Sequence, residues 1–270
     1  MQKKRILLVV VILLSAVGLC QAATDELHGT IDVTYLSKWV WRGFTVYGKQ
    51  SAIQPSIDLD LYGTGFGVSA MGHRANSSGY EASERWDYSL YYGNKLWDTE
   101  SYATNYRISW VYYNFPQLDD HYMDLQETNL VLSWPKICPA GLVPSYVLVK
   151  MWPSSSGSWL GSPKSDGTAS GFAHIFMLDY PLQLQSVLPE TPAQVINLHS
   201  EVVYNDGISP VPGHYVGHDW SNAVFGISTN FDLGNKVTLT PGVYHQITMD
   251  KSVNPNKDET WASVSLKYAF

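Results

Sequence analysis

The chain ends in Thr260-Trp261-Ala262-Ser263-Val264-Ser265-Leu266-Lys267-Tyr268-Ala269-Phe270. In an extended strand, Val264, Leu266, Tyr268 and Phe270 fall on one face, whereas the small and polar residues between them fall on the other. A barrel wall with lipid outside and water or polar side chains inside has this alternation. The segment therefore predicts the closing strand of a bacterial outer-membrane β-barrel. The alternative is an amphipathic edge strand of a secreted β-sandwich.

The other end of the chain predicts export. Lys3, Lys4 and Arg5 precede an unbroken aliphatic run over residues 6–14, and residues 15–23 turn to smaller side chains. These are the charged, apolar and cleavage regions of a signal peptide. The aliphatic run is too short for a transmembrane helix, so this segment addresses the protein rather than anchoring it.

We expect cleavage after Ala22 or Ala23, which leaves residues 24–270 as one domain because no linker divides them. Lipidation at Cys20 is disfavoured, since Leu19 stands where a small residue is needed. The removed segment carries three of the 17 Lys and Arg, so 14 remain against 24 Asp and Glu, a formal charge of −10. This acidity gives no support to nucleic-acid binding. Cys138 alone remains, so no intramolecular disulfide can form.

Alternation with a period of two recurs along the mature chain, without sustained helical periodicity. Segments of nine to thirteen residues suit tilted membrane strands. We therefore predict an all-β fold, a single antiparallel transmembrane β-barrel of about 12 strands. The candidate strands are residues 30–42, 50–61, 66–74, 85–92, 102–114, 122–134, 143–152, 172–180, 194–204, 222–232, 236–246 and 260–270.

Such a barrel has short periplasmic turns and longer outer loops. With both termini periplasmic, the short connections 62–65 and 233–235 fall inside, and the long ones 153–171 and 205–219 fall outside. Residues 181–193 are long for an inner turn. Pro55 and Pro241 lie within strand patterns, where they predict β-bulges because proline cannot donate to the ladder.

The faces of the predicted strands define an outside and a lumen. In the first strand, Ile31, Val33 and Tyr35 share a face with Trp39 and Trp41. The polar faces of the strands are predicted to line the lumen, and they carry both positive and negative side chains. Its candidate residues are Asp32, Thr34, Lys38, Gln54, Ser56, Asp58, Asp60, Arg85, Asp87, Ser89, Asn105, Arg107, Ser109, Asn197, His199, Glu201, Asn222, Ser228, Asn230, Ser263, Ser265 and Lys267.

Arg85 and Arg107 face the same side of adjacent predicted strands. They could border a constriction that favours anions. Equally, Asp87 and nearby carboxylates could neutralise both arginines within a closed interior. The strand register decides between these alternatives, and one sequence does not fix it.

One stretch carries a family resemblance. Tyr35-Leu36-Ser37-Lys38-Trp39-Val40-Trp41-Arg42-Gly43, followed by Ala52-Ile53-Gln54-Pro55-Ser56 and Gly65-Phe66-Gly67, resembles the opening of the Gcw_chp family of exported bacterial proteins, which has no assigned biochemical function. Met71-Gly72 stands where that family has Trp-Gly. The resemblance implies an outer-membrane barrel with the pattern carried by Tyr35, Ser37, Arg42, Gly43, Gln54 and Pro55. We expect structural roles for these residues, with Gly43 in a tight turn and Arg42 at the rim or paired with Gln54 or Asp58.

Catalytic and metal-binding patterns are weak. Embedded hydrolases need a histidine and a hydroxyl on one face. His199 and Ser200 point to opposite faces, and His174 and His245 have no hydroxyl two residues on. His214, His218 and Asp219 could hold a transition metal, yet they lack a firm third ligand, and a solvated loop is the simpler interpretation. We expect no enzyme activity, no metal and no cofactor.

We therefore predict a porin-like passive channel for small polar solutes in the outer membrane of a Gram-negative-type bacterium. A non-conducting structural or surface-adhesion barrel is the alternative, and a membrane-embedded hydrolase is less favoured. Outer-membrane lipid and the barrel-assembly machinery are the expected partners. Phe270 and Tyr268 are the expected assembly signal.

Overall fold

The computed structural model describes residues 26–118, 124–154, 170–188, 190, 194–208, 217–254 and 257–270. The predicted signal peptide with Cys20, most of the predicted loop 153–171, and His214 lie outside the described residues. Within the described residues, no helix is long and apolar enough to cross a membrane.

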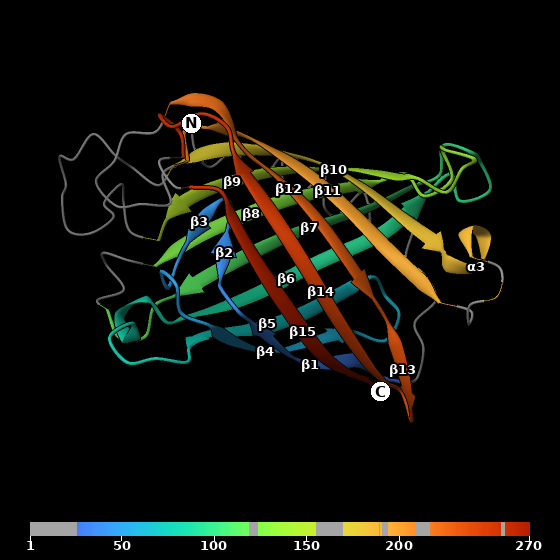
Figure 1. Cartoon of the computed structure of the whole chain (residues 1–270), viewed down its shortest axis with the longest axis horizontal. Coiled ribbons are helices and arrows are strands. Elements are labelled where there is room, and N and C mark those ends of the chain that lie inside the picture. The colour runs from blue at the N-terminus through green and yellow to red at the C-terminus, as the bar shows by residue number, and fades with distance from the viewer. Residues whose placement is uncertain are drawn as a thin grey trace.

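The described chain forms a closed antiparallel β-barrel, and the predicted fold is thereby confirmed (Figure 1). Twelve long strands follow each other around the wall in chain order, and the short β13 (Phe231–Gly234) continues β12 along the edge of β14. The wall strands are β1 (His28–Leu36), β4 (Ala52–Asp60), β5 (Phe66–Ala75), β6 (Arg85–Leu96), β7 (Thr104–Asn114), β8 (Leu125–Ser133), β9 (Val143–Pro153), β10 (Gly171–Gln183), β11 (Val195–Asp206), β12 (His218–Thr229), β14 (Val237–Thr248) and β15 (Glu259–Ala269).

The barrel closes where the first strand meets the last. β1 pairs with β15 from Thr30 opposite Ala269 onward. Beyond that pair, Gly29 and Phe270 exchange two backbone hydrogen bonds of 3.0 and 3.2 Å. A Cβ on Gly29 would lie 2.8 Å from the Phe270 ring, so this glycine leaves room for the terminal aromatic side chain. Closure satisfies the edge strands' backbone groups, which hydrocarbon could not.

The alternation separates a lipid face from a lumen face, because directly paired residues project to the same side. On β15, Val264, Leu266 and Tyr268 are 42 to 48% exposed on the outside. Residues between them face inward. By pairing, the inner face holds Asp32, Thr34, Gln54, Ser56, Asp58, Asp60, Arg85, Asp87, Ser89, Asn105, Arg107, Ser109, Asn197, His199, Glu201, Asn222, Ser228, Ser263, Ser265 and Lys267.

The connections alternate between two ends of the barrel. We name the end that holds His28 and Ala269 the inner end and the opposite end the outer end. Residues 61–65 and 234–236 make tight turns at the inner end with left-handed backbone at Gly63 and Gly234. The longer inner connection begins with the single helical turn α3 (Leu184–Val187), which lies at the same end as the C-terminus in Figure 1. The predicted loop 205–219 is shorter than expected, because β11 runs on to Asp206 and β12 begins at His218.

The two prolines do not produce the predicted bulges. Val33 pairs with Pro55 and Pro241 pairs with Val264, and the register stays in step on both sides of each proline. Register shifts occur instead between Val203 and Tyr204 and near Gly234. A wall strand therefore accommodates each proline at the loss of a donor, without an extra residue.

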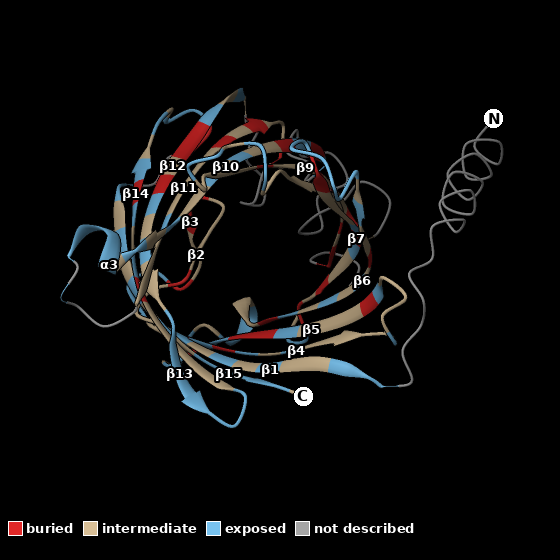
Figure 2. Ribbon diagram, turned by 90° about the vertical axis from the view of Figure 1, so that its right-hand side faces the viewer, coloured by how far each residue is buried: buried red, intermediate tan, exposed pale blue. Residues whose placement is uncertain are grey.

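The first predicted strand is too long. β1 ends at Leu36, where its partner β4 begins at Ala52, and residues 37–51 then fold into the barrel. Within this inserted segment, β2 (Val40–Trp41) and β3 (Phe44–Thr45) form a small hairpin, which lies inside the ring of wall strands (Figure 2). Trp39 and Trp41 consequently do not share the lipid face of Tyr35. They point at polar groups of the lumen wall.

Candidate functional site: the lumen and its inserted segment

The tip of the inserted segment is a turn with left-handed backbone. Arg42 has φ 50° and Gly43 has φ 87°. The Gly43 carbonyl accepts hydrogen bonds from the side-chain amides of Gln246 at 3.0 Å and Asn254 at 3.1 Å. A Cβ on Gly43 would lie 2.3 Å from the Asn254 amide nitrogen, so only glycine permits this approach to the wall.

Arg42 reaches across the lumen from this turn. Its Nη2 lies 2.5 Å from the Glu127 carboxylate on β8, and both side chains are largely buried. Burial by itself lowers the pKa of the Arg42 guanidinium, but Glu127, together with Tyr113 and Glu201, outweighs burial, so the pKa lies above its ordinary value. The predicted positions of Arg42, at the rim or against Gln54 or Asp58, are wrong. The reason is that the chain carries Arg42 inward before the residue can meet β4.

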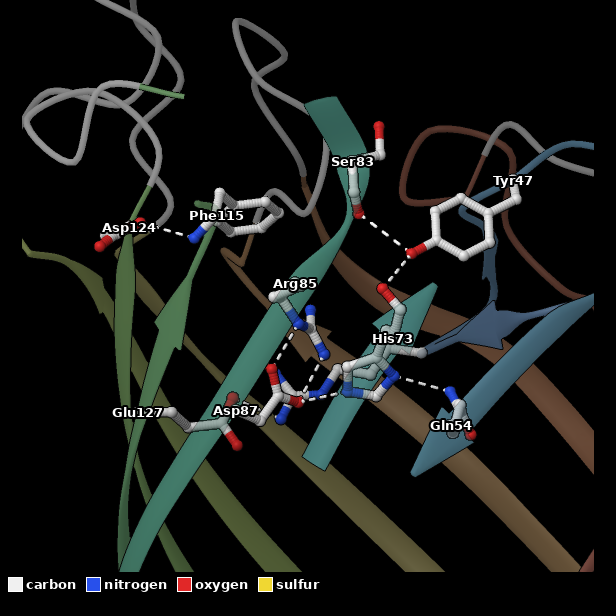
Figure 3. A network of polar contacts seen from close by, with 10 residues as sticks. Tyr47, Gln54, His73, Ser83, Arg85, Asp87, Phe115, Asp124 and Glu127 are labelled. Carbon is white, nitrogen blue, oxygen red and sulfur yellow. Dashed lines mark hydrogen bonds and ion pairs between the residues drawn. The ribbon is translucent and has the colours of Figure 1, made fainter. Parts of the chain in front are cut away.

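A network of polar contacts on the wall strands β4, β5 and β6 lies against the inserted segment (Figure 3). The Gln54 amide contacts His73 at 2.7 Å, His73 contacts Asp87 at 2.8 Å, and Arg85 donates two hydrogen bonds to Asp87 at 2.6 and 2.9 Å. Each of these four side chains comes from β4, β5 or β6. This network of polar contacts holds the Arg85 guanidinium at a fixed place in the lumen.

Aromatic rings of the inserted segment pack against His73 and the Arg85 guanidinium. Trp39 is 4% exposed and stacks on His73 with centroids 4.3 Å apart. The Arg85 guanidinium lies 4.3 Å from the Trp41 ring centroid and 4.4 Å from that of Tyr113 on β7. A guanidinium between aromatic faces is favourable because the ring quadrupole attracts the cation. The predicted lipid-facing tryptophans are therefore the segment's anchors.

Tyr47 also fixes the inserted segment to the wall. Its fully buried hydroxyl donates to the backbone carbonyl of His73 at 2.7 Å. Burial raises the pKa of this hydroxyl, so it stays a donor well above neutral pH. Lys38 pairs with Glu259 on β15, whose other oxygen accepts from Thr45 at 3.4 Å. The inserted segment is thus tied to several strands around the outer half of the wall.

Arg85 and Arg107 do not form one constriction. Both face the lumen, but Arg107 lies opposite Gly93, eight residues along β6 from Arg85. At about 3.4 Å per residue, the two positions are about 27 Å apart along the direction of the strands. The neutralised alternative holds for Arg85, which is 2% exposed and bonded to Asp87.

Arg107 stands in the inner half of the lumen and is more open to solvent. Its guanidinium lies 3.5 Å from the Tyr91 ring centroid and 3.6 Å from the Asp58 carboxylate, which also accepts a 2.5 Å hydrogen bond from the Tyr91 hydroxyl. The Arg107 side chain is 42% exposed. Asp60, a predicted constriction residue, instead accepts from the backbone nitrogen of Gly63 at 2.5 Å and stabilises the inner turn.

His199 and Glu201 lie on the lumen face of β11, close to the inserted segment. The His199 Nδ1 is 2.7 Å from Asp179 on β10, and its Nε2 is 3.9 Å from Glu201. Sequence reasoning missed Asp179, because only the register of β10 against β11 brings it beside His199. It also missed Glu127, since both faces of β8 carry polar residues and parity gave no direction.

The other residues of the family pattern have structural positions. Tyr35 is 45% exposed on the lipid face, and Pro55 faces outward beside it. Ser37 ends the β1 ladder, with its hydroxyl accepting from the Ala262 nitrogen at 2.8 Å. Gln54 belongs to the network of polar contacts described above.

The candidate catalytic and metal residues remain separate. Pairing puts His199 inside and Ser200 outside. His174 contacts the Tyr146 hydroxyl at 2.7 Å, and His245 contacts the Thr260 hydroxyl of the next strand at 2.8 Å. His218 bonds to Asp206 rather than to Asp219. In the part of the chain that the structure describes, no group of three or more His, Cys, Asp or Glu residues could hold a metal ion.

Fold and lumen together define a β-barrel of the outer-membrane type, with a polar inner face and a segment folded into the outer half. No family model matches the chain, so membership of the Gcw_chp family stays a prediction. No curated protein matches it either.

Solved structures share the fold. The KdgM porin in complex with disordered oligogalacturonate has a TM-score of 0.51 at 10% identity, over 89% of this chain and 99% of that one. The NanC porin has a TM-score of 0.52 at 10% identity, over 89% and 98%. An outer membrane channel from Pseudomonas putida F1 has a TM-score of 0.49 at 9% identity, over 93% and 97%. At these identities the likeness concerns the fold of outer-membrane barrels alone.

Proposed function

We propose that the protein is a porin-like passive channel for small polar solutes in the outer membrane. One observation carries the proposal: a lumen lined at several levels by charged and polar side chains, with an inserted segment that narrows its outer half. Twelve strands lie between the filled eight-stranded barrels and the open sixteen-stranded porins, so a narrowed pore is the expected form. The fold shared with the KdgM porin, which was solved in complex with disordered oligogalacturonate, supports a polar solute.

Selection by solute size and selection by ion charge arise at two different levels of the lumen. At the outer level, Glu127 and Asp87 neutralise Arg42 and Arg85, so this level sets width more than charge. At the inner level, Arg107 is exposed enough to meet a passing ion. Ion selectivity therefore depends on Arg107 and its neighbours rather than on the predicted pair of arginines.

An enzymatic role is not part of this proposal. A hydrolase needs a nucleophile, a base within hydrogen-bond reach and a group that orients the base. The His245 and Thr260 pair supplies the first two on the lipid face, but no carboxylate or amide side chain of the described residues hydrogen-bonds to the His245 ring. The geometry therefore favours passage of solutes over chemistry on them.

Planar-bilayer recording of the refolded protein tests the channel. Discrete steps of conductance that persist at constant voltage are expected, and the same protein left unfolded serves as the control. Refolded, heat-modifiable protein that inserts without conducting would overturn the proposal. That result would favour the alternative, a structural or adhesive barrel.

A further inference from the structure

A pocket of about 190 Å³ opens toward the lumen between the inserted segment and the wall of β11, β12, β14 and β15. It is smaller than the ~300–1,000 Å³ that drug-sized ligands occupy, so its size suits one ring of a solute. Its lining joins aromatic and polar groups, which are Arg42, His199, Glu201, Tyr244, Gln246 and Trp261.

Two rings form the floor of this pocket. Tyr244 on β14 is paired with Trp261 on β15, and the rings are nearly parallel, at 14° with centroids 5.5 Å apart. A Cβ on Gly226 would lie 2.5 Å from the Tyr244 ring, and one on Gly242 would lie 3.0 Å from it. The Tyr244 ring therefore lies against two glycines of the wall, and the Trp261 ring is stacked beside it. Larger side chains at these glycines would force the ring away from the wall.

Two of the residues that line the pocket, Gln246 and Arg42, each have a polar atom without a hydrogen-bond partner in the described chain. Gln246 is fully buried, and its Nε2 is held by the Gly43 carbonyl, so its Oε1 is fixed in place. Neither that oxygen nor Nη1 of Arg42 has a hydrogen-bond partner in the described chain. One is an acceptor and the other a donor, both buried. Burying such groups unpaired is costly, so a ligand hydroxyl that bonds to either would be favoured.

The charged groups around the pocket carry a net negative charge, because carboxylates outnumber cations among them. Arg42 is paired with Glu127, and His199 lies between Asp179 and Glu201. No unpaired cation is left to attract an anion, and Glu201 would repel one. Apolar C–H groups, by contrast, are attracted to the negative face of an aromatic ring. A ligand with hydroxyl groups along its edge, an apolar face and no charge meets all of these demands.

We propose that this pocket binds one pyranose ring of a neutral saccharide, stacked on Tyr244 and Trp261 with its hydroxyls on Arg42, Gln246 and Glu201. The inference deepens the proposed function, on which it rests, by naming the class of solute that pauses in the channel. The inserted segment is part of the site, because it supplies Arg42 and fixes Gln246.

Calorimetric titration of the whole refolded protein, in a detergent without a sugar headgroup, tests the pocket. The probes are methyl α-D-glucopyranoside, the acyclic polyol sorbitol and the anion glucuronate. Saturable binding is expected for the pyranoside, and at least tenfold weaker binding for the other two. Trp261→Ala should weaken pyranoside binding about tenfold, which corresponds to about 1.4 kcal/mol.

Two further variants keep the test decisive. Gly226→Ala keeps both rings but displaces Tyr244, and it should also weaken binding several-fold. Trp110→Ala removes a lipid-facing ring that is 42% exposed and should leave binding unchanged. If Trp261→Ala does not fold, as judged by heat-modifiable mobility, Gly226→Ala carries the test.

The pocket and the channel can fail separately. A conducting protein without saturable pyranoside binding would overturn the saccharide site and leave the channel. Binding that sorbitol or glucuronate matches would also overturn the neutral pyranose assignment. A protein that binds the pyranoside in the predicted way but never conducts would retain the site and refute the channel.

Discussion

Removing the ring of Trp39 should release the inserted segment without opening the barrel. This side chain is 4% exposed, stacks on His73 and lies 4.9 Å from the Tyr47 ring centroid. Truncating a buried Trp to Ala costs about 3–5 kcal/mol. The wall is independent of this ring, because the ladder of β1 with β4 and β15 contains no residue of the inserted segment. The loss therefore falls on docking, a local equilibrium within a folded protein.

A cost of about 3–5 kcal/mol lowers the ratio of docked to undocked segment by a factor between about 140 and about 4,000. Hydrogen exchange can read this ratio at two amides of the segment: Val46, which donates to the Trp39 carbonyl, and Gln50, which donates to that of Tyr47. Their protection in Trp39→Ala should fall by up to this factor. Single-channel conductance should rise, because the segment no longer narrows the lumen.

The control is Trp110→Ala, which removes a tryptophan from the lipid face and should change neither readout. Heat-modifiable mobility shows that each variant has formed its barrel. Protection at Val46 within about threefold of the parent, together with unchanged conductance, would refute the reasoning. It would mean that Arg42, Gly43 and Tyr47 hold the segment without the ring.

Arg85→Met should lower the free energy of unfolding by about 3–5 kcal/mol, because Asp87 keeps a buried charge without its main partner; denaturant titration measures this, and a loss under 1 kcal/mol would contradict it. Arg107→Ser should shift the reversal potential toward cation preference at low salt, with a shift that shrinks as salt rises; Arg74→Ser, which removes a cation from the outward face of β5, should shift it less. Deleting Phe270 should reduce the amount of membrane-inserted, heat-modifiable protein, since closure at Gly29 and the terminal aromatic are lost together; normal amounts would exclude that role.

The barrel itself could be predicted from local pattern. Each wall strand has one face in lipid and one in the lumen, so its sequence records the alternation residue by residue. The closing strand that ends at Phe270, the number of wall strands and the inward side of Arg107 all follow from that period. Strand ends were less predictable, because a ladder stops where its partner stops. For this reason β1 ends at Leu36, although the alternation continues to Trp41.

The site depended on contacts between residues far apart in the chain. Nothing in the local pattern distinguishes Trp39 and Trp41 from lipid-facing rings, because an aromatic residue suits both a membrane interface and a cation in the lumen. Only the tertiary structure brings Arg42 to Glu127 and Tyr244 to Trp261.

Register explains the remaining difference. A strand's own sequence states which side a residue faces but not the level at which it meets the neighbouring strand. Arg85 and Arg107 could therefore be assigned to one side from the sequence, whereas their separation by eight positions of β6 came from the pairing. The alternation determined a polar lumen, and the register together with the inserted segment decided where that lumen narrows.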